Sequence, residues 1–315
     1  MRKKLAIVGA TGLVGETVLK VFFELGLNKN FDLVLFSSEK SVGKKIYFNC
    51  DEYKLNTLDE NFFDFKLDYA IFCTDEIVSK NWVKKFINRG IVVIDNSSAF
   101  RLVGEIPLVV PEINFCDVGN STLIANPNCS TIQLAIVLNK LANFVKIKKV
   151  IVSTYQSVSG AGKLALDDFY YKTNKFFPNF INENLIPFIG KIDDSGFCSE
   201  ELKIINETEK ILHSRIDIFA NTVRVPIPYC HGESVYVEFE GDIDINFIKN
   251  NLSDDCIVYD ETICLSRCVN TNKIYVSRLR QCKNNSLMFF EVADNLRRGA
   301  AFNALGILKK LCKLR

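Results

Sequence analysis

The sequence places one cysteine, Cys129, at the expected start of a helix. Residues 122–125 are typical of a strand, Pro127 ends it, and apolar spacing over residues 130–144 predicts a helix. Cys129 would then lie at the first helical turn, where unpaired N–H groups and the helix dipole favour an anion. A thiol placed there has a lowered pKa and is a better nucleophile, although most cysteines are buried and inert.

Five residues in the second half are candidates to assist a thiolate. Gln156 ends a predicted strand and could orient a carbonyl group or a catalytic side chain. Glu200 and Lys203 share a helix face, which also suits an ordinary surface ion pair. Arg224 and His231 are brought together if the chain folds back at the prolines between them. A histidine suits general acid–base chemistry, although a single His is more often structural.

A glycine motif opens the chain. An apolar strand over residues 5–8 is followed by Gly9, Gly12 and Gly15 and by a helix expected over residues 16–25. Such glycines allow a tight turn and let the backbone approach a pyrophosphate at the helix N-terminus, although a similar turn can form without a ligand.

The residues at the end of the second predicted strand indicate which dinucleotide binds. NAD enzymes usually place an acidic residue there for the ribose diol. Here Ser37, Lys40 and Ser41 suit a ribose 2′-phosphate, whereas Glu39 argues for NAD. We therefore favour NADP.

The elements of the first half predict a doubly wound α/β domain. Apolar runs at residues 32–36, 69–73 and 91–95 suit a parallel sheet covered on both faces, with a crossover helix over residues 78–87. Arg101 follows the last of these strands in a polar loop, at the edge where such sheets bind ligands. It is a candidate clamp for an oxyanion or phosphate, or else forms a surface salt bridge.

The second half has a different character. Alternation predicts a half-buried strand over residues 149–156, and helices are expected over residues 163–175 and from an N-cap at Ser199 to residue 212. Strands that look antiparallel follow at residues 222–227, 234–240, 273–280 and 287–292, the last two joined by a hairpin turn. A final helix, capped by Asp294 or Asn295 and ending near Leu314, could return to the first domain.

Composition excludes several function classes. The 315 residues carry a net charge of +2 without a strong block of one sign, which gives no case for nucleic acid or a membrane as partner. No apolar stretch suits a membrane span or a signal peptide, and eleven scattered cysteines fit reduced thiols, so a cytoplasmic protein is expected. With two histidines and no paired cysteine motif, no metal site is expected.

Taken together, these stretches resemble aspartate-semialdehyde dehydrogenases. The segments that carry the resemblance follow the family's order over nearly the whole chain, and they are residues 9–15, 94–101, 110–114, 126–131, 154–162, 200–203, 224–231 and 294–301. The Asn-Pro-Asn-Cys-Ser-Thr segment at 126–131 and the spacing from Arg224 to His231 are the specific ones.

The resemblance implies NADPH-dependent reductive dephosphorylation of L-aspartyl 4-phosphate to L-aspartate 4-semialdehyde, with a thioester on the cysteine. The pathway would be the biosynthesis of lysine, threonine, methionine and diaminopimelate. The implied site residues are Cys129 as nucleophile, His231 as general acid/base, Gln156 and Asn128 near the intermediate, Arg101 and Lys203 for phosphate, Arg224 for the substrate carboxylate, Glu200 for its ammonium, and Gly9, Thr11, Gly12, Leu13, Val14, Ser37, Lys40, Ser41, Ser159, Gly160, Gly162 and Asn295 for NADP.

The resemblance also implies the domain organisation. A Rossmann-type NADP domain would comprise residues 1–127 and 294–315, and an α+β catalytic and dimerisation domain with a mostly antiparallel sheet would comprise residues 128–293. A homodimer is expected. The sequence departs from the family at residues 73–79, where Asp75 and Glu76 lie near the expected phosphates, at Lys40, where Arg is usual, and at Cys230, which precedes His231.

Other interpretations of the sequence also remain open. N-acetylglutamyl-phosphate reductase shares the architecture and the thiol chemistry, but its nucleophile lies in a Gly-Cys-Tyr context. A glyceraldehyde-3-phosphate dehydrogenase would show Ser-Cys-Thr-Thr and an acidic ribose binder. A non-catalytic nucleotide-binding paralogue has no need of Cys129, Gln156, Arg224 and His231 together.

Overall fold

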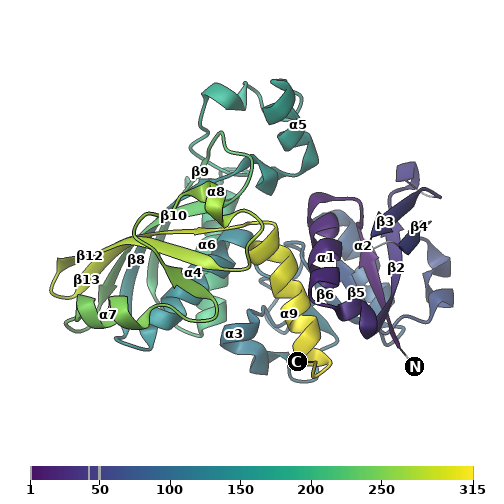
Figure 1. Ribbon diagram of the computed structural model, residues 1–315, viewed down its shortest axis with the longest axis horizontal. Coiled ribbons are helices and arrows are strands. Elements are labelled where there is room, and N and C mark those ends of the chain that lie inside the picture. Colours follow the sequence, from purple (N-terminus) through teal and green to yellow (C-terminus); the bar gives the residue numbers. More distant parts are fainter. Residues whose placement is uncertain (1, 42, 49–50, 315) are drawn as a thin grey trace. The chain divides into compact units, whose positions relative to one another are not determined.

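The chain forms two compact units in a computed structural model that describes residues 2–41, 43–48 and 51–314. One unit comprises residues 1–127 and 300–315, and the other comprises residues 128–299 (Figure 1). The first boundary is the one expected from the sequence, and the second boundary was expected at Asp294.

The first unit is built on a seven-stranded sheet. Its order is β3 (Lys45–Phe48), β4 (Asp51–Thr57), β2 (Phe31–Ser37), β1 (Lys3–Val8), β5 (Tyr69–Phe72), β6 (Val92–Asp95) and β7 (Leu123–Ala125). All neighbouring strands are parallel except β3 and β4. The predicted strands are therefore confirmed. Strands β3 and β4 were missed, because β3 is a four-residue strand at the edge of the sheet and β4 carries mostly polar side chains.

The strands of this sheet are continuous apolar runs because each face of the sheet packs in its own hydrophobic core. Leu5 and Ile7 of β1 pack in one core with residues of α1 (Leu13–Glu24) and α9 (Phe302–Leu311). Ala6 and Val8 belong to the other core, with residues of α2 (Glu76–Ile87). Successive strand residues point to opposite faces, so helices on both faces require an apolar residue at every position. The doubly wound Rossmann-type fold is confirmed.

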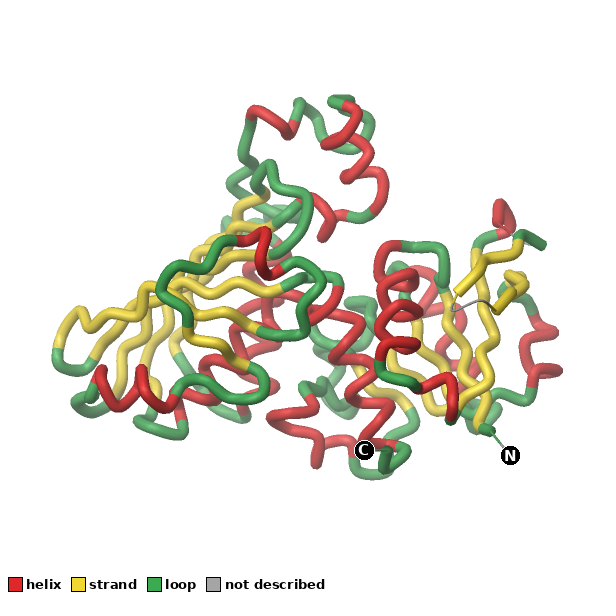
Figure 2. The backbone as a smooth tube through the Cα atoms, viewed as in Figure 1, coloured by secondary structure: helices red, strands yellow, loops and turns green. Residues whose placement is uncertain are grey.

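The second unit has a mixed, mostly antiparallel sheet, shown in yellow in Figure 2. Its order is β11 (Ile257–Tyr259), β12 (Ile274–Lys283), β13 (Ser286–Ala293), β10 (His231–Phe239), β8 (Ile147–Gln156) and β9 (Asp217–Arg224). The pairs β11–β12 and β8–β9 are parallel and the other three are antiparallel. The helices are α4 (Cys129–Ala142), α5 (Lys163–Tyr171), α6 (Ser199–Leu212), α7 (Ile245–Asn251) and α8 (Leu265–Cys268). Helix α4 packs against β8 and β13, and α6 packs against α4 and β9.

Two expectations for the second unit were wrong. Strand β9 was expected to be antiparallel and to reach residue 227, but it runs parallel to β8 and ends at Arg224. Pro226 lacks the N–H that would continue the ladder, and the crossover through α5 and α6 returns the chain in the same direction. Helix α6 is capped by Cys198 rather than Ser199, since Glu201 accepts the Cys198 N–H at 2.8 Å.

The C-terminal segment returns the chain to the first unit. The Asp294 carboxylate accepts the N–H groups of Leu296 and Arg297, which confirms it as a cap. The following residues, Arg297–Ala301, form a π-helical turn before α9 begins at Phe302. Helix α9 ends at Leu311, slightly before the expected end. Among the helices of the described residues, none combines the length and apolar character that a membrane crossing requires.

Candidate active site

Cys129 is the first residue of helix α4 and is half-buried. Asn128 is the N-cap, and its Oδ1 accepts the N–H groups of Ser130 at 2.9 Å and Thr131 at 3.2 Å. The expected helix start is therefore confirmed. The cap fixes the first turn, so the position of the thiol is set by the backbone of Asn128.

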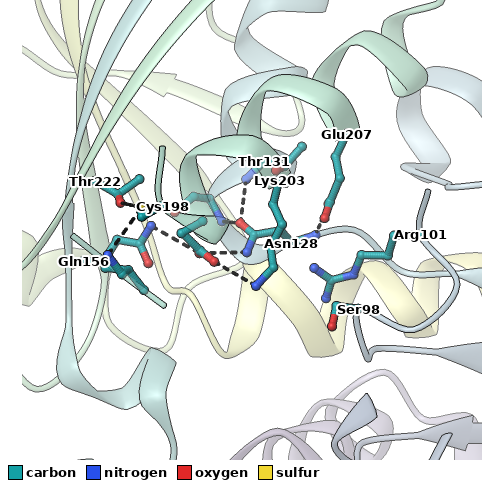
Figure 3. Close-up of polar contacts among 12 residues, drawn as sticks. Ser98, Arg101, Asn128, Thr131, Gln156, Cys198, Lys203, Glu207 and Thr222 are labelled. Atoms are coloured by element: carbon teal, nitrogen blue, oxygen red, sulfur yellow. Dashed lines mark hydrogen bonds and ion pairs between the residues drawn. The ribbon is translucent and has the colours of Figure 1, made fainter. Parts of the chain in front are cut away.

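Asn128 is itself anchored by two buried acids on α6. Its backbone N–H donates to Glu207 Oε2 at 2.6 Å, and its Nδ2 donates to Glu200 Oε1 at 2.8 Å. Figure 3 shows Asn128 between Thr131 and Glu207. Positions 200, 203 and 207 share one helix face, which turns toward α4. Glu207 was not predicted from the sequence, although its spacing from Glu200 places the two residues on one helix face.

Glu200 is charged although it is only 6% exposed. Burial raises the pKa of its carboxyl, but the charge of Lys203 and the Asn128 amide outweigh burial and hold the pKa below its usual value. Lys203 Nζ lies 3.1 Å from Glu200 Oε2, and Gln156 Nε2 lies 3.4 Å from Oε1. Glu200 thus contacts Asn128, Lys203 and Gln156.

The sheet brings Arg224 and His231 to opposite sides of Gln156. Gln156 pairs with Arg224 in the parallel ladder of β8 and β9, and with His231 in the antiparallel ladder of β8 and β10. Arg224 Nη1 donates to the Ser157 carbonyl at 2.6 Å. The expected fold-back is confirmed, and Cys230 makes it in a left-handed conformation with φ +71°, a conformation that glycine adopts most easily.

His231 is fully buried, and its two ring nitrogens have different surroundings. Nδ1 accepts the Ser157 N–H at 3.0 Å, so a neutral ring carries its proton on Nε2. Burial and the charge of Arg224 lower the pKa of His231 to about 3, so the ring is neutral near pH 7. Nε2 has no hydrogen-bond partner among the described residues. This neutral imidazole is arranged to donate a proton.

Two glycines make close approaches that side chains would block. A Cβ on Gly160 would lie 3.0 Å from both Arg224 Nη1 and His231 Nε2, so these two groups converge on one place. A Cβ on Gly299 would lie 2.8 Å from the Cβ of Cys129. Gly299 was not singled out from the sequence, because a close approach between segments far apart in the chain leaves no local pattern.

The predicted cofactor residues of the second unit surround the His231 loop. Asn295 Oδ1 accepts the Ser157 hydroxyl, the Ser159 hydroxyl and the Cys230 N–H, at 3.0 to 3.2 Å. Gly162 is the C-cap of the 3-10 turn Val158–Ala161, which contains Ser159, and it has φ +94°. Ser159, Gly160 and Asn295 thus hold the segment against which His231 is bound.

The first unit contains a cleft at the carboxyl ends of its strands. It has a volume of about 390 Å³, and its lining includes Gly9, Thr11, Gly12, Ser37, Ser38, Glu39 and Trp82. Gly9 has φ +85°, and a Cβ there would lie 2.5 Å from the Cys73 carbonyl oxygen. Gly12 is the N-cap of α1, followed by Leu13 and Val14 in its first turn. The backbone N–H groups of such a turn suit a phosphate, so these residues fit a dinucleotide.

The remaining predicted residues of the first unit have distinct surroundings. Arg101 is 9% exposed and its Nη2 donates to the Asn96 carbonyl at 2.6 Å, which is unlike an exposed surface pair. Ser41 donates its N–H to the Ser38 carbonyl at 2.9 Å. Lys40 lies in the same 3-10 turn, and its side chain is outside the described part of the structure.

The two acids that depart from the family pattern are engaged in the first unit. Asp75 caps α2 by accepting the Val78 N–H at 2.9 Å. Glu76 pairs with Lys80 one turn later and accepts the Ser98 hydroxyl at 3.0 Å. Both carboxylates therefore stabilise the start of α2 and its neighbouring loop, and Asp75 also lines the cleft.

Comparisons with known proteins agree across the whole chain. Residues 4–121 match the semialdehyde dehydrogenase NAD binding domain, and residues 138–298 match the semialdehyde dehydrogenase dimerisation domain. The chain is 40% identical to an aspartate-semialdehyde dehydrogenase of Campylobacter jejuni, covering 100% of this chain and 98% of the relative. It is 37% identical to that of Bacillus subtilis, covering 98% and 97%.

A solved structure shows the same fold. The crystal structure of aspartate semialdehyde dehydrogenase II from Vibrio cholerae, complexed with ASA, superposes with a TM-score of 0.94 at 36% identity, covering 99% of both chains. The matched domains, the relatives and this structure agree with the fold of the two units. The chain belongs to the aspartate-semialdehyde dehydrogenase family of oxidoreductases.

Proposed function

We propose that this chain reduces L-aspartyl 4-phosphate to L-aspartate 4-semialdehyde, with NADPH as the reductant and inorganic phosphate as the leaving group. The observation that carries the proposal is the grouping of Cys129, at a capped helix start, with Gln156, Glu200, Arg224 and His231 in one unit. Cys129 is near enough that its charge acts on Arg224. A binding module would need no such set.

The chemistry starts at the thiolate of Cys129. Its sulfur forms a bond to the acyl carbon while the bond from that carbon to the phosphate oxygen breaks, and the electron pair leaves with phosphate. The thioester divides one difficult step into two easier ones. NADPH, when bound, supplies the hydride that reduces the acyl carbon. Cys129 leaves as a thiolate when the carbon–sulfur bond breaks, which restores the nucleophile.

His231 acts on the oxygen of the reacting carbonyl. Its Nε2–H is the available donor, because Nδ1 already accepts the Ser157 N–H. A neutral donor aimed at an oxygen that gains negative charge stabilises the transition state through its hydrogen bond, and the proton that it gives to this oxygen returns to the ring when the carbonyl re-forms and the thiolate leaves. Gln156, between Arg224 and His231 in the sheet, positions the intermediate.

Charged groups recognise the ends of the substrate. Arg224, which is 5% exposed, binds the substrate carboxylate, since a guanidinium pairs with a carboxylate through two parallel hydrogen bonds. Glu200 binds the ammonium group. Lys203 and Arg101 bind phosphate. Asn128 orients the nucleophile's helix and lies beside the oxyanion.

The proposed dinucleotide is NADP, bound by the cleft of the first unit. Ser37 and Ser38 line this cleft and can donate hydrogen bonds to a 2′-phosphate, and the neighbouring Lys40 adds positive charge. Glu39 also lines the cleft and opposes such an anion. The serines and Lys40 are proposed to outweigh it.

The proposed assembly is a homodimer formed through the sheet of the second unit. The dimerisation-domain match covers this sheet. Its face away from α4 exposes apolar side chains, with Ile151 46%, Tyr155 40% and Phe219 54% exposed, and large exposed apolar patches mark interaction sites. Light scattering should find a dimer that Phe219→Arg converts to a monomer, whereas Ile77→Arg, at an exposed site of α2, leaves it intact.

The substrate proposal is tested in the oxidative direction. Purified protein should reduce NADP with aspartate semialdehyde only when inorganic phosphate is present. N-acetylglutamate semialdehyde, whose amine is blocked and uncharged, should give no turnover. Turnover of the acetylated compound alone would identify an N-acetylglutamyl-phosphate reductase. A folded protein that binds NADPH but turns over neither compound would identify a non-catalytic paralogue.

A further inference from the structure

Two buried acids face each other beside the proposed site and have no part in the chemistry above. Glu233 of β10 lies directly opposite Glu291 of β13 in the antiparallel ladder. Both residues are 0% exposed. No ion pair among the described residues includes either one. Residues opposite in such a ladder have their Cβ atoms only about 5 Å apart, so the carboxyl groups are held together by the sheet.

The surroundings of the pair are neutral or negative. Ser130 and Gln133 of α4 adjoin the Glu233 carboxyl, and the charge of Glu200 from α6 also bears on it. In the ladders, Thr154 of β8 lies opposite Glu233, and Val276 of β12 lies opposite Glu291. The four carboxyl oxygens of Glu233 and Glu291, the hydroxyl of Ser130 and Oε1 of Gln133 have no hydrogen-bond partner in the described part of the chain.

These contacts connect the pair to both proposed reacting residues. Ser130 directly follows Cys129 in the first turn of α4. Gln133, one turn later, donates its Nε2–H to the His231 carbonyl at 3.4 Å. His231 and Glu233 are two residues apart in β10, so their side chains lie on the same face of the sheet. The pair thus lies between the nucleophile's helix and the strand that carries the proton donor.

Two ionised carboxylates cannot lie together in such a place. Burial without a cation disfavours the charged form, and each negative charge opposes the other. We propose that Glu233 and Glu291 hold at least one proton between them near neutral pH, and that this pair positions the first turn of α4 against β10. They are positioning residues. The protonation is independent of the proposed function, and only the effect on turnover rests on it.

The pKa values give the direction of the pH dependence. Burial and the adjacent carboxyl raise the pKa of Glu291 well above its usual value, and burial raises that of Glu233 to about 8. Because the folded chain then holds protons that the unfolded chain has lost, the pair's contribution to stability falls as pH rises from the ordinary carboxyl range toward 8.

Infrared spectroscopy of the full chain tests the proton directly. The wild-type spectrum at pH 7 should contain a protonated-carboxyl C=O band that shifts on ¹³C-glutamate labelling, which excludes aspartates such as the buried Asp95. The band should be lost from the double variant Glu233→Gln/Glu291→Gln. It should persist in Glu238→Gln, a control on the other face of β10 that pairs with Lys148. Absence of a labelled band from the wild type at pH 7 would overturn the proposal, whether or not the variants fold.

Turnover and thiol reactivity test the positioning role. Glu233→Gln keeps a hydrogen-bonding group and should retain kcat within about threefold, whereas Glu233→Ala should lose about tenfold or more with little change in KM. The rate of Cys129 alkylation by iodoacetamide, which needs no cofactor, should change in parallel. If Glu233→Ala does not fold, Glu291→Val takes its place. Unchanged alkylation in the Ala or Val variant would overturn the positioning role even in a chain without dehydrogenase activity.

Discussion

The side-chain amide of Asn128 donates to Glu200 at 2.8 Å, so the cap of the nucleophile's helix is bonded to the residue proposed to hold the substrate ammonium. The backbone of Asn128 is bonded to Glu207, about two turns further along the same face of that helix. Helix α6 therefore positions α4 through two carboxylates. The proposed recognition of the substrate ammonium and the position of the thiol therefore depend on the same helix.

Loss of the Glu207 carboxylate should displace Cys129. Glu207→Ala leaves the buried Asn128 N–H without its acceptor, at a cost of about 1–3 kcal/mol in the free energy of unfolding. Chemical denaturation measures this cost, and iodoacetamide labelling of Cys129 should slow. Glu209→Ala, on the same helix but half-buried, is the control and should change neither. Wild-type stability in Glu207→Ala would show that this bond does not anchor the cap.

A methyl group at position 299 should inactivate the enzyme without changing any proposed catalytic side chain. The added Cβ of Gly299→Ala would lie 2.8 Å from the Cβ of Cys129, so the thiol must shift. A misplacement of about 1 Å costs about 10²-fold in kcat. Gly104→Ala is the control, because no atom lies within 4 Å of the added group. Steady-state kinetics with full activity in Gly299→Ala would contradict the described packing.

His231 should stay neutral through the physiological range. The chain has two histidines, so ¹H–¹³C NMR of the imidazole groups should show one signal that does not titrate between about pH 5 and 8 and that disappears in His231→Asn. His213→Asn should leave that signal in place. Because the folded pKa is depressed, the unfolded chain binds a proton first as pH falls, so this residue's contribution to stability is lost below about pH 6.5. Titration of the His231 signal near neutral pH would contradict a neutral proton donor.

Lys40 should distinguish NADPH from NADH. Trp82 is the only tryptophan of the chain and lines the cleft, so its fluorescence should report binding of either dinucleotide. Lys40→Ala should weaken NADPH by about tenfold and leave NADH nearly unchanged, since only NADPH carries the 2′-phosphate. Lys44→Ala is the control for a general loss of positive charge. Equal weakening of both dinucleotides would remove Lys40 from the 2′-phosphate site.

Local sequence patterns predicted most of the fold and part of the candidate site. A doubly wound sheet is predicted by strand β1, the glycines after it and the apolar runs of β5 and β6. The strands are apolar because both of their faces are buried. Pro127 and the helical spacing after it placed Cys129 at a helix start for the same local reason.

What the sequence could not show depends on contacts between distant segments. The parallel direction of β9 depends on where the crossover through α5 and α6 returns the chain. Gly299 is defined by its approach to Cys129, and the pairing of Glu233 with Glu291 depends on the register of β10 and β13. Strands β3 and β4 were not predicted, because β3 is a four-residue edge strand and β4 carries mostly polar side chains.

The covalent intermediate on Cys129 is the central claim, and intact-protein mass spectrometry tests it most directly. The protein is incubated with aspartate semialdehyde and NADP without phosphate, so that the thioester forms but cannot be released to phosphate. The account predicts an added aspartyl group that peptide mapping places on Cys129, that phosphate removes and that Cys129→Ala lacks, while the control Cys116→Ala keeps it. Turnover with phosphate but with no adduct on Cys129, or with the adduct on another cysteine, would contradict the account.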